Sequence, residues 1–272
     1  RLPNRAPTGS TGDSEDNRVI SNAVGFTYES PEGNSIYHAG QIRLNKRMRR
    51  GLSVMALYTF SKSIDNASTF GGAGNVVAQD DSNLSAERAL SSFDRRHTLS
   101  LNGMYSSPVT GTRTRNLPRW AVATLRDWSA MMGITAQTGT PYTARVLGTA
   151  SDAGGTGAVG SARADATGLA VDSGTSYFNL AAFSVPSSNS YGNAARNTIP
   201  GQPMVSVNAN LGRGFQLGKE TRRQIEFRAS ANNLLNHPNI TGLGTVVNSV
   251  NYGLATSVGN MRTVTMSLRL RF

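Results

Sequence analysis

Long runs in which apolar and polar residues alternate restrict the fold of this chain more than any other feature. In the closing stretch "MRTVTMSLRLRF", Val264, Met266, Leu268 and Leu270 occupy one parity, and Thr, Ser and Arg residues occupy the other. Successive side chains of a β-strand point to opposite faces, so this pattern predicts a strand with one apolar and one polar face. Similar runs predict strands near residues 35–48, 51–63, 95–106, 126–139, 203–213, 222–235 and 261–272, and a less regular run predicts another near 19–30.

The length of these strands indicates a membrane barrel rather than a soluble sheet. The runs span roughly 10–13 residues, whereas strands of globular proteins usually contain about 5–6. A strand tilted by about 45° crosses the hydrocarbon of a bilayer with about 10 residues. A mean hydropathy of −0.31 is compatible with this reading, because an alternating strand averages out on a hydropathy scale. We therefore expect an all-β fold, an antiparallel transmembrane β-barrel segment of about 7–8 strands.

The charges indicate which face of these strands meets lipid. The apolar parity carries almost no charge, whereas the polar parity carries Arg43, Arg47, Glu226, Arg228, Arg269 and Arg271. An Arg that faces lipid at the bilayer midplane costs about 2–4 kcal/mol. The apolar face is therefore expected to contact hydrocarbon, and the polar face a hydrated lumen.

The connections between the strands predict two different rims. Short turns near 49–51 and 214–221 alternate with long segments near 64–94, 141–202 and 236–260, and outer-membrane barrels have short periplasmic turns and long extracellular loops. The segment near 107–125 lies on the short-turn rim but is longer than this rule predicts. A last strand that runs downward gives a periplasmic C-terminus, and residues 1–18 form a polar terminal segment. Aromatic residues then form a lower girdle of Tyr105, Trp128, Phe215 and Phe272 and an upper girdle of Tyr58, Phe60 and Tyr142.

A formal net charge of +11 raises the question of nucleic-acid binding. Single-stranded nucleic acid requires a contiguous basic groove with stacking aromatic residues, and the sequence shows none. Instead the basic residues sort to the predicted lower rim, and the acidic ones sort to the upper loops. These acidic residues are Asp65, Asp80, Asp81, Glu87, Asp152, Asp165 and Asp172. We therefore expect anionic lipid headgroups rather than nucleic acid as partners.

No residue pattern in the chain indicates catalysis. The three histidines are His38, His97 and His237, and the sequence contains no nucleophile elbow, no HExxH motif and no cysteine. Asp80 and Asp81 offer oxygen ligands for Ca²⁺, but such ligands are far from sufficient for a site, and a solvated loop turn explains the two residues better. We expect no enzyme activity, catalytic residue, cofactor or metal, and the pattern assigns no ligand-binding residue.

Several sequence blocks together resemble a known family. "SIYHAGQIRLNKRMRRGLSVMALYTFSKSID", "SNLSAERALSSFDRRHTLSLNGMYSSP", "WSAMMGITAQTGTPYT", "YFNLAAFSVP", "GNAARNTIPGQP" and "FRASANNLLNHPNI" follow one another. Their order and spacing resemble the C-terminal part of TonB-dependent outer-membrane receptors of the Oar-like type. The resemblance implies a roughly 22-stranded barrel, of which this chain forms the last third. The stretch "NNLLNH" resembles the family's penultimate-strand signature, and Phe272 the signal that the barrel-assembly machinery reads.

The resemblance also implies a function and a set of partners. The chain would form barrel wall and ligand-capturing extracellular loops of a TonB-dependent transporter or receptor. Its implied partners are outer-membrane lipids, an N-terminal plug and further barrel strands, a TonB-type energy transducer, the assembly machinery at Phe272, and an unidentified ligand.

Two other functions stay open at the sequence level. An extracellular structural or adhesive β-rich surface protein would bury its apolar faces between chains. A hydrolase in an autotransporter-like or lipase-like barrel would require a histidine near a loop serine.

Overall fold

The computed structural model describes residues 31–67, 78–80, 83–107, 118, 120, 122, 126–147, 162–172, 176–187, 190–216 and 224–271. The predicted terminal segment 1–18, the predicted strand near 19–30 and the terminal Phe272 lie outside the described residues. Within the described part of the chain, no helix has the length and apolar character needed to cross a membrane.

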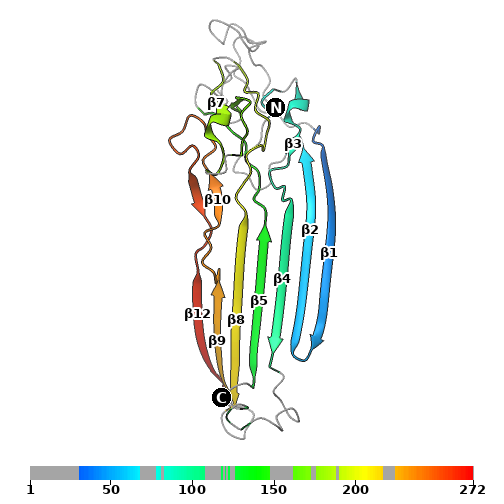
Figure 1. Cartoon of the computed structure of the whole chain (residues 1–272), viewed down its shortest axis with the longest axis vertical. Coiled ribbons are helices and arrows are strands. Elements are labelled where there is room, and N and C mark those ends of the chain that lie inside the picture. The colour runs from blue at the N-terminus through cyan, green and yellow to red at the C-terminus, as the bar shows by residue number, and fades with distance from the viewer. Residues whose placement is uncertain are drawn as a thin grey trace.

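Seven long strands lie side by side in one antiparallel sheet (Figure 1). Each long strand pairs with the next long strand along the chain, and the short β3 (Ala89–Leu90) adds to one end of β2. The spatial order is β1 (Ser35–Arg49), β2 (Leu52–Asp65), β4 (His97–Ser106), β5 (Trp128–Gln137), β8 (Met204–Gln216), β9 (Gln224–Asn232) and β12 (Thr263–Arg271). The bounds of these strands differ from the predicted spans by three residues or fewer.

The hairpin between β1 and β2 shows how the local sequence fixes the register. Arg50 and Gly51 have φ angles of 54° and 84°, and two central residues with positive φ are typical of the two-residue turns that match strand twist. Past a register shift between Lys46 and Arg49, the two strands pair without interruption up to Ser35 and Asp65. We call this end of the sheet the turn end.

Shorter elements gather beyond the opposite end of the sheet, which we call the loop end (Figure 1). They form a unit with its own hydrophobic core, made chiefly of Ala144, Val146, Phe178, Phe183 and Ile199. This loop unit contains η1 (Leu84–Glu87), β6 (Asp165–Ala166), η4 (Leu180–Ala182), β7 (Phe183–Ser184), β10 (Ile240–Leu243) and β11 (Ala255–Val258). The sequence predicts only long loops here, so the packed core of this unit is a feature that alternation does not reveal.

The two edge strands, β1 and β12, each pair with a neighbour on one side only. The described sheet is therefore open. Open edges expose unpaired backbone N–H and C=O groups. Such groups are not stable in hydrocarbon, so in a membrane further strands must pair with both edges.

Candidate functional site

The apolar face of the sheet exposes large side chains, most strongly on the two edge strands, whereas Val207 and Ala231 of the inner strands are buried. Ile42 and Leu44 of β1 are 61% and 66% exposed, and Met266 and Leu268 of β12 are 71% and 72% exposed. In the described structure no second sheet covers this face, since the two other sheets are two-stranded pairs within the loop unit. Contiguous exposed apolar surface of this extent marks a contact surface, either with lipid or with another protein.

The expectation that this face carries almost no charge needs a correction. The observed register places three basic residues on it: Lys46, Lys62 and Arg213. Lys62 lies opposite His38, and Arg213 lies opposite Trp128. All three lie near a strand end, where a long cationic side chain can extend toward a membrane interface.

Aromatic residues surround His97 toward the loop end of the apolar face. The Tyr58 hydroxyl hydrogen-bonds to Nδ1 of His97 at 2.8 Å, and the Phe60 ring lies 5.2 Å from the imidazole. Tyr142 does not join this group. It packs against the loop-unit core and donates from its hydroxyl to the Thr241 carbonyl at 2.9 Å, because the chain has left the sheet after Gln137.

A second aromatic group lies toward the turn end of the same face. The guanidinium carbon of Arg213 lies 4.4 Å from the centre of the Phe215 ring and 5.1 Å from the centre of the Trp128 ring. Such distances give favourable cation–π contacts. Sequence reasoning does not single out Arg213, because the strand expected there ends at residue 213, whereas β8 continues to Gln216.

The polar face carries the predicted charges, and some of them pair. Arg228 binds Glu226 with an N–O distance of 2.8 Å, and Arg271 approaches the other oxygen of Glu226 at 3.8 Å. Arg269 lies directly opposite Glu226 in the register. The acidic residues of the long strands therefore lie on the polar face, whereas basic residues occur on both faces.

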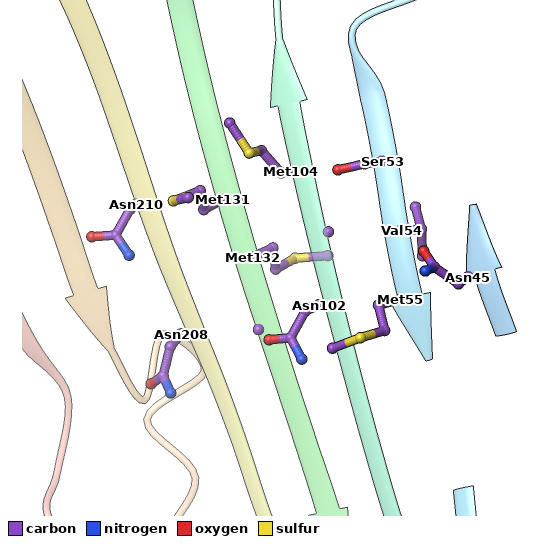
Figure 2. A pocket seen from close by; sticks show the side chains of 12 residues that line it. Asn45, Ser53, Val54, Met55, Asn102, Met104, Met131, Met132, Asn208 and Asn210 are labelled. Atoms are coloured by element: carbon purple, nitrogen blue, oxygen red, sulfur yellow. The ribbon is translucent and has the colours of Figure 1, made fainter. Parts of the chain in front are cut away.

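A shallow hollow of about 430 Å³ lies on the middle of the sheet, mostly on the polar face (Figure 2). Figure 2 shows methionine and asparagine side chains from β1, β2, β4, β5 and β8 around it. The side chains of the polar parity that line it are uncharged: Asn45, Ser53, Met55, Asn102, Met104, Met131, Asn208 and Asn210. This uncharged patch could accommodate a neutral surface within a lumen.

Buried ion pairs join separate segments of the loop unit. Arg163 binds Glu87 at 2.7 Å, and their side chains are only 7% and 3% exposed. Arg196 binds Asp65 at 2.8 Å and also donates to the backbone carbonyl of Glu87 at 2.9 Å. Asp65 and Glu87, predicted only as acidic loop residues, therefore connect both ends of the segment near 64–94 to the long segment near 141–202.

Two further groups in the loop unit have shifted pKa values. Burial raises the pKa of Tyr252 to about 12. Burial lowers the pKa of Arg145, whose backbone bridges to Arg163 and Val246. Both shifts follow from the poor solvation of the charged form inside a packed unit.

Potential metal ligands stay dispersed among the described residues. There, no cluster of three or more His, Cys, Asp or Glu side chains has the arrangement to hold a metal ion. Asp80 is half-buried, and Asp81 lies outside the described residues. His97 contacts aromatic residues, and His237 contacts Asn239 at 3.3 Å.

The "NNLLNH" stretch forms a polar corner where the chain leaves β9. Asn233 has a φ of 48°, and its side chain donates to the carbonyls of His237 and Asn260 and accepts from the His237 amide. Asn239 pairs with both backbone groups of Val205 at the start of β8. The side chains of these asparagines thus bond to backbone groups where the hydrogen bonds between strands end. Their role is structural.

Comparison with known proteins supplies the family. A family model described as an outer membrane beta barrel domain matches residues 2–265. No curated protein and no solved structure gives a match. Nearly the whole chain is covered, and the long antiparallel strands with one exposed apolar face fit such a domain. The chain therefore belongs to the outer membrane beta barrel domain family, and the protein is an outer-membrane protein.

Proposed function

We propose that this chain is part of a TonB-dependent transporter or receptor, in which it forms barrel wall and ligand-capturing extracellular loops. The series of sequence blocks from "SIYHAGQIRLNKRM" to "FRASANNLLNHPNI" carries this proposal, since their order and spacing resemble that group of proteins. The open sheet is compatible with a large barrel, because both β1 and β12 have an edge at which further strands of the same protein would pair.

The two ends of the sheet support an orientation for this proposal. The loop unit, with its long connections, would lie outside the cell, and the turn end would lie in the periplasm with the C-terminus. Phe272 would then supply the signal for barrel assembly. The loop unit is a prefolded surface, since buried ion pairs and a hydrophobic core hold it together. Preorganised loops bind a ligand at a smaller entropic cost than flexible ones.

In the proposed mechanism this part of the protein performs no chemistry. The loop unit would capture the ligand, and energy from a TonB-type transducer would move a plug within the lumen. The uncharged hollow of Figure 2 would face that lumen. Because its lining has no charged side chain, a neutral plug surface could move past it without breaking an ion pair between plug and barrel wall.

Binding to the transducer tests this proposal without knowledge of the ligand. The full-length protein in detergent should bind the purified periplasmic domain of a TonB-type transducer from the same cell saturably. The resemblance implies that a TonB box in the full-length protein would make this contact, and deletion of that box should abolish the binding. A full-length protein that binds no such domain, or that is monodisperse in buffer without detergent, would contradict the proposal. Assembly in detergent-free buffer that depends on concentration would favour the structural or adhesive alternative.

A further inference from the structure

We propose that the apolar face carries a specific phospholipid site at its turn end, in which Arg213 binds the headgroup phosphate and an adjacent apolar hollow holds an acyl chain. The inference rests on the outer-membrane location of the protein and is independent of the transport proposal. Its occupant is a membrane phospholipid.

The position of Arg213 is unusual for a charged residue. It shares its parity with Val205, Val207, Ala209 and Leu211, so its side chain leaves the sheet on the apolar side. Near a bilayer interface an outward Arg costs at most about 1 kcal/mol, compared with about 2–4 kcal/mol at the midplane. An interfacial depth therefore suits this residue.

Two aromatic rings fix the guanidinium at that depth. Phe215 and Trp128 lie 4.4 and 5.1 Å from the guanidinium carbon, one along the same strand and one on the neighbouring strand. Tryptophan concentrates at membrane–water interfaces, where its ring meets both environments. The Nε of Arg213 is buried, so the two terminal nitrogens of the planar guanidinium are the donors that would meet a phosphate.

A hollow for an acyl chain begins directly above this cluster. It has a volume of about 440 Å³ and an almost entirely apolar lining. Leu211 belongs to the lining and lies two residues before Arg213 on the same face, a rise of about 7 Å along the strand. Small side chains create the depression, because the adjacent positions Ala130, Ala209, Ala229 and Ala231 stand between larger ones such as Tyr105, Met132 and Leu211.

The charge of the face favours an anionic group at Arg213. In the seven described strands the apolar parity includes Lys46, Lys62 and Arg213 but no Asp or Glu. The phosphate of a phospholipid lies at the interface with its acyl chains directed toward the midplane. That geometry matches a cation at the strand end followed by an apolar hollow toward the middle of the strand.

Native mass spectrometry of the full-length protein tests the site. The protein is purified in a maltoside detergent, which contains no phosphate, and titrated with phosphatidylethanolamine. The control lipid is a glucosyl diacylglycerol with the same acyl chains. We expect preferential retention of one phosphatidylethanolamine molecule by the wild-type protein. Arg213→Gln should weaken this retention about tenfold, Arg213→Lys should weaken it less, and Ala229→Leu should weaken it by filling the hollow.

Arg228→Gln is the matched control, because Arg228 lies opposite Gly212 and so at the height of Arg213, but on the polar face. This variant should retain the lipid as the wild-type protein does. Heat-modifiable gel migration verifies that each variant is folded. Equal retention of both lipids by the wild-type protein, or equal retention of phosphatidylethanolamine by all four variants, would overturn the proposal. Neither result would bear on binding of the transducer domain.

Discussion

At the residue scale, Tyr252 shows that the loop unit is packed like a small protein core. Its ring meets Phe178 edge-on at 5.5 Å, and its hydroxyl donates to the Leu180 carbonyl at 3.1 Å. Burial raises its pKa from 10.0 to about 12. Because the folded state holds this proton more tightly, the resulting stability is complete below pH 10 and is lost as the pH rises toward 12.

The pKa shift of Tyr252 predicts a distinct phenolate titration. The difference in absorbance near 295 nm between the wild-type protein and Tyr252→Phe should titrate with a midpoint near pH 12. The same subtraction on urea-unfolded protein supplies the reference and should titrate near pH 10. A folded-state midpoint near 10 would show that the ring is solvated and that the loop unit is not packed as described.

The buried pair of Arg163 and Glu87 yields a second prediction at this scale. Glu87→Gln leaves the guanidinium of Arg163 buried without its carboxylate, a change that costs about 3–5 kcal/mol in proteins. The Arg163 amide, which donates to the Gln79 side chain, should therefore exchange its hydrogen at least about 100-fold faster.

An exposed pair on the polar face provides the control for that measurement. Arg228 is 63% exposed in its pair with Glu226, and exposed pairs contribute at most about 1 kcal/mol. Arg228→Gln should leave exchange in the loop unit unchanged. Unchanged exchange in Glu87→Gln as well would mean that the ion pair does not hold the two loops together.

At the scale of elements, the asparagine corner after β9 determines where the long strand ends. Asn233→Ala removes three side-chain hydrogen bonds and places alanine at a φ of 48°. We expect a loss of about 2–4 kcal/mol in local stability, measured as faster hydrogen exchange at the loop end of β12. Leu235→Ala is the control, since Leu235 lies in the same corner with an apolar side chain that is 66% exposed. Equal exchange in both variants would refute the structural role of Asn233.

The division of β12 into two faces predicts that neighbouring positions respond oppositely to charge. Met266 lies opposite Ala229 on the apolar face, and Thr265 lies opposite Ser230 on the polar face. Met266→Arg should destabilise the full-length protein in phospholipid vesicles by about 2–4 kcal/mol, whereas Thr265→Arg should change its stability little. The free energy of unfolding of both variants is measured by denaturant titration, in which the loss of heat-modifiable gel migration reports the unfolded fraction. Equal destabilisation by the two substitutions would contradict the assignment of faces.

The sequence predicts the long strands well because their signal is local. Alternation with a period of two reads directly as a strand, and one slipped residue would reverse both faces. The loop unit lacks such a signal: Asp65 and Arg196 form an ion pair although 131 residues separate them. The site at Arg213 depends on a strand end and on two aromatic partners, so alternation alone does not identify it.

At the scale of the whole molecule, the two parts of the chain place their apolar side chains in opposite environments. The loop unit buries its apolar side chains inside, as a water-soluble protein does. The sheet instead exposes its apolar side chains and has a charged reverse face. This arrangement is stable when hydrocarbon surrounds one face and water fills the space behind the other. The membrane itself therefore replaces the missing core of the sheet.

Spin-label accessibility along β5 of the full-length protein in phospholipid vesicles tests this central claim most directly. The 272-residue chain contains no cysteine, so single cysteines at residues 129–136 place one label at a time in this part of the protein, with any cysteine elsewhere replaced by serine. Labels at Ala130, Met132 and Ile134 should collide with oxygen, which dissolves in lipid, and labels at Ser129, Met131 and Thr135 with a water-soluble nickel chelate. Accessibility that alternates in this phase is the predicted result. Accessibility in the opposite phase, or without alternation, would contradict the account.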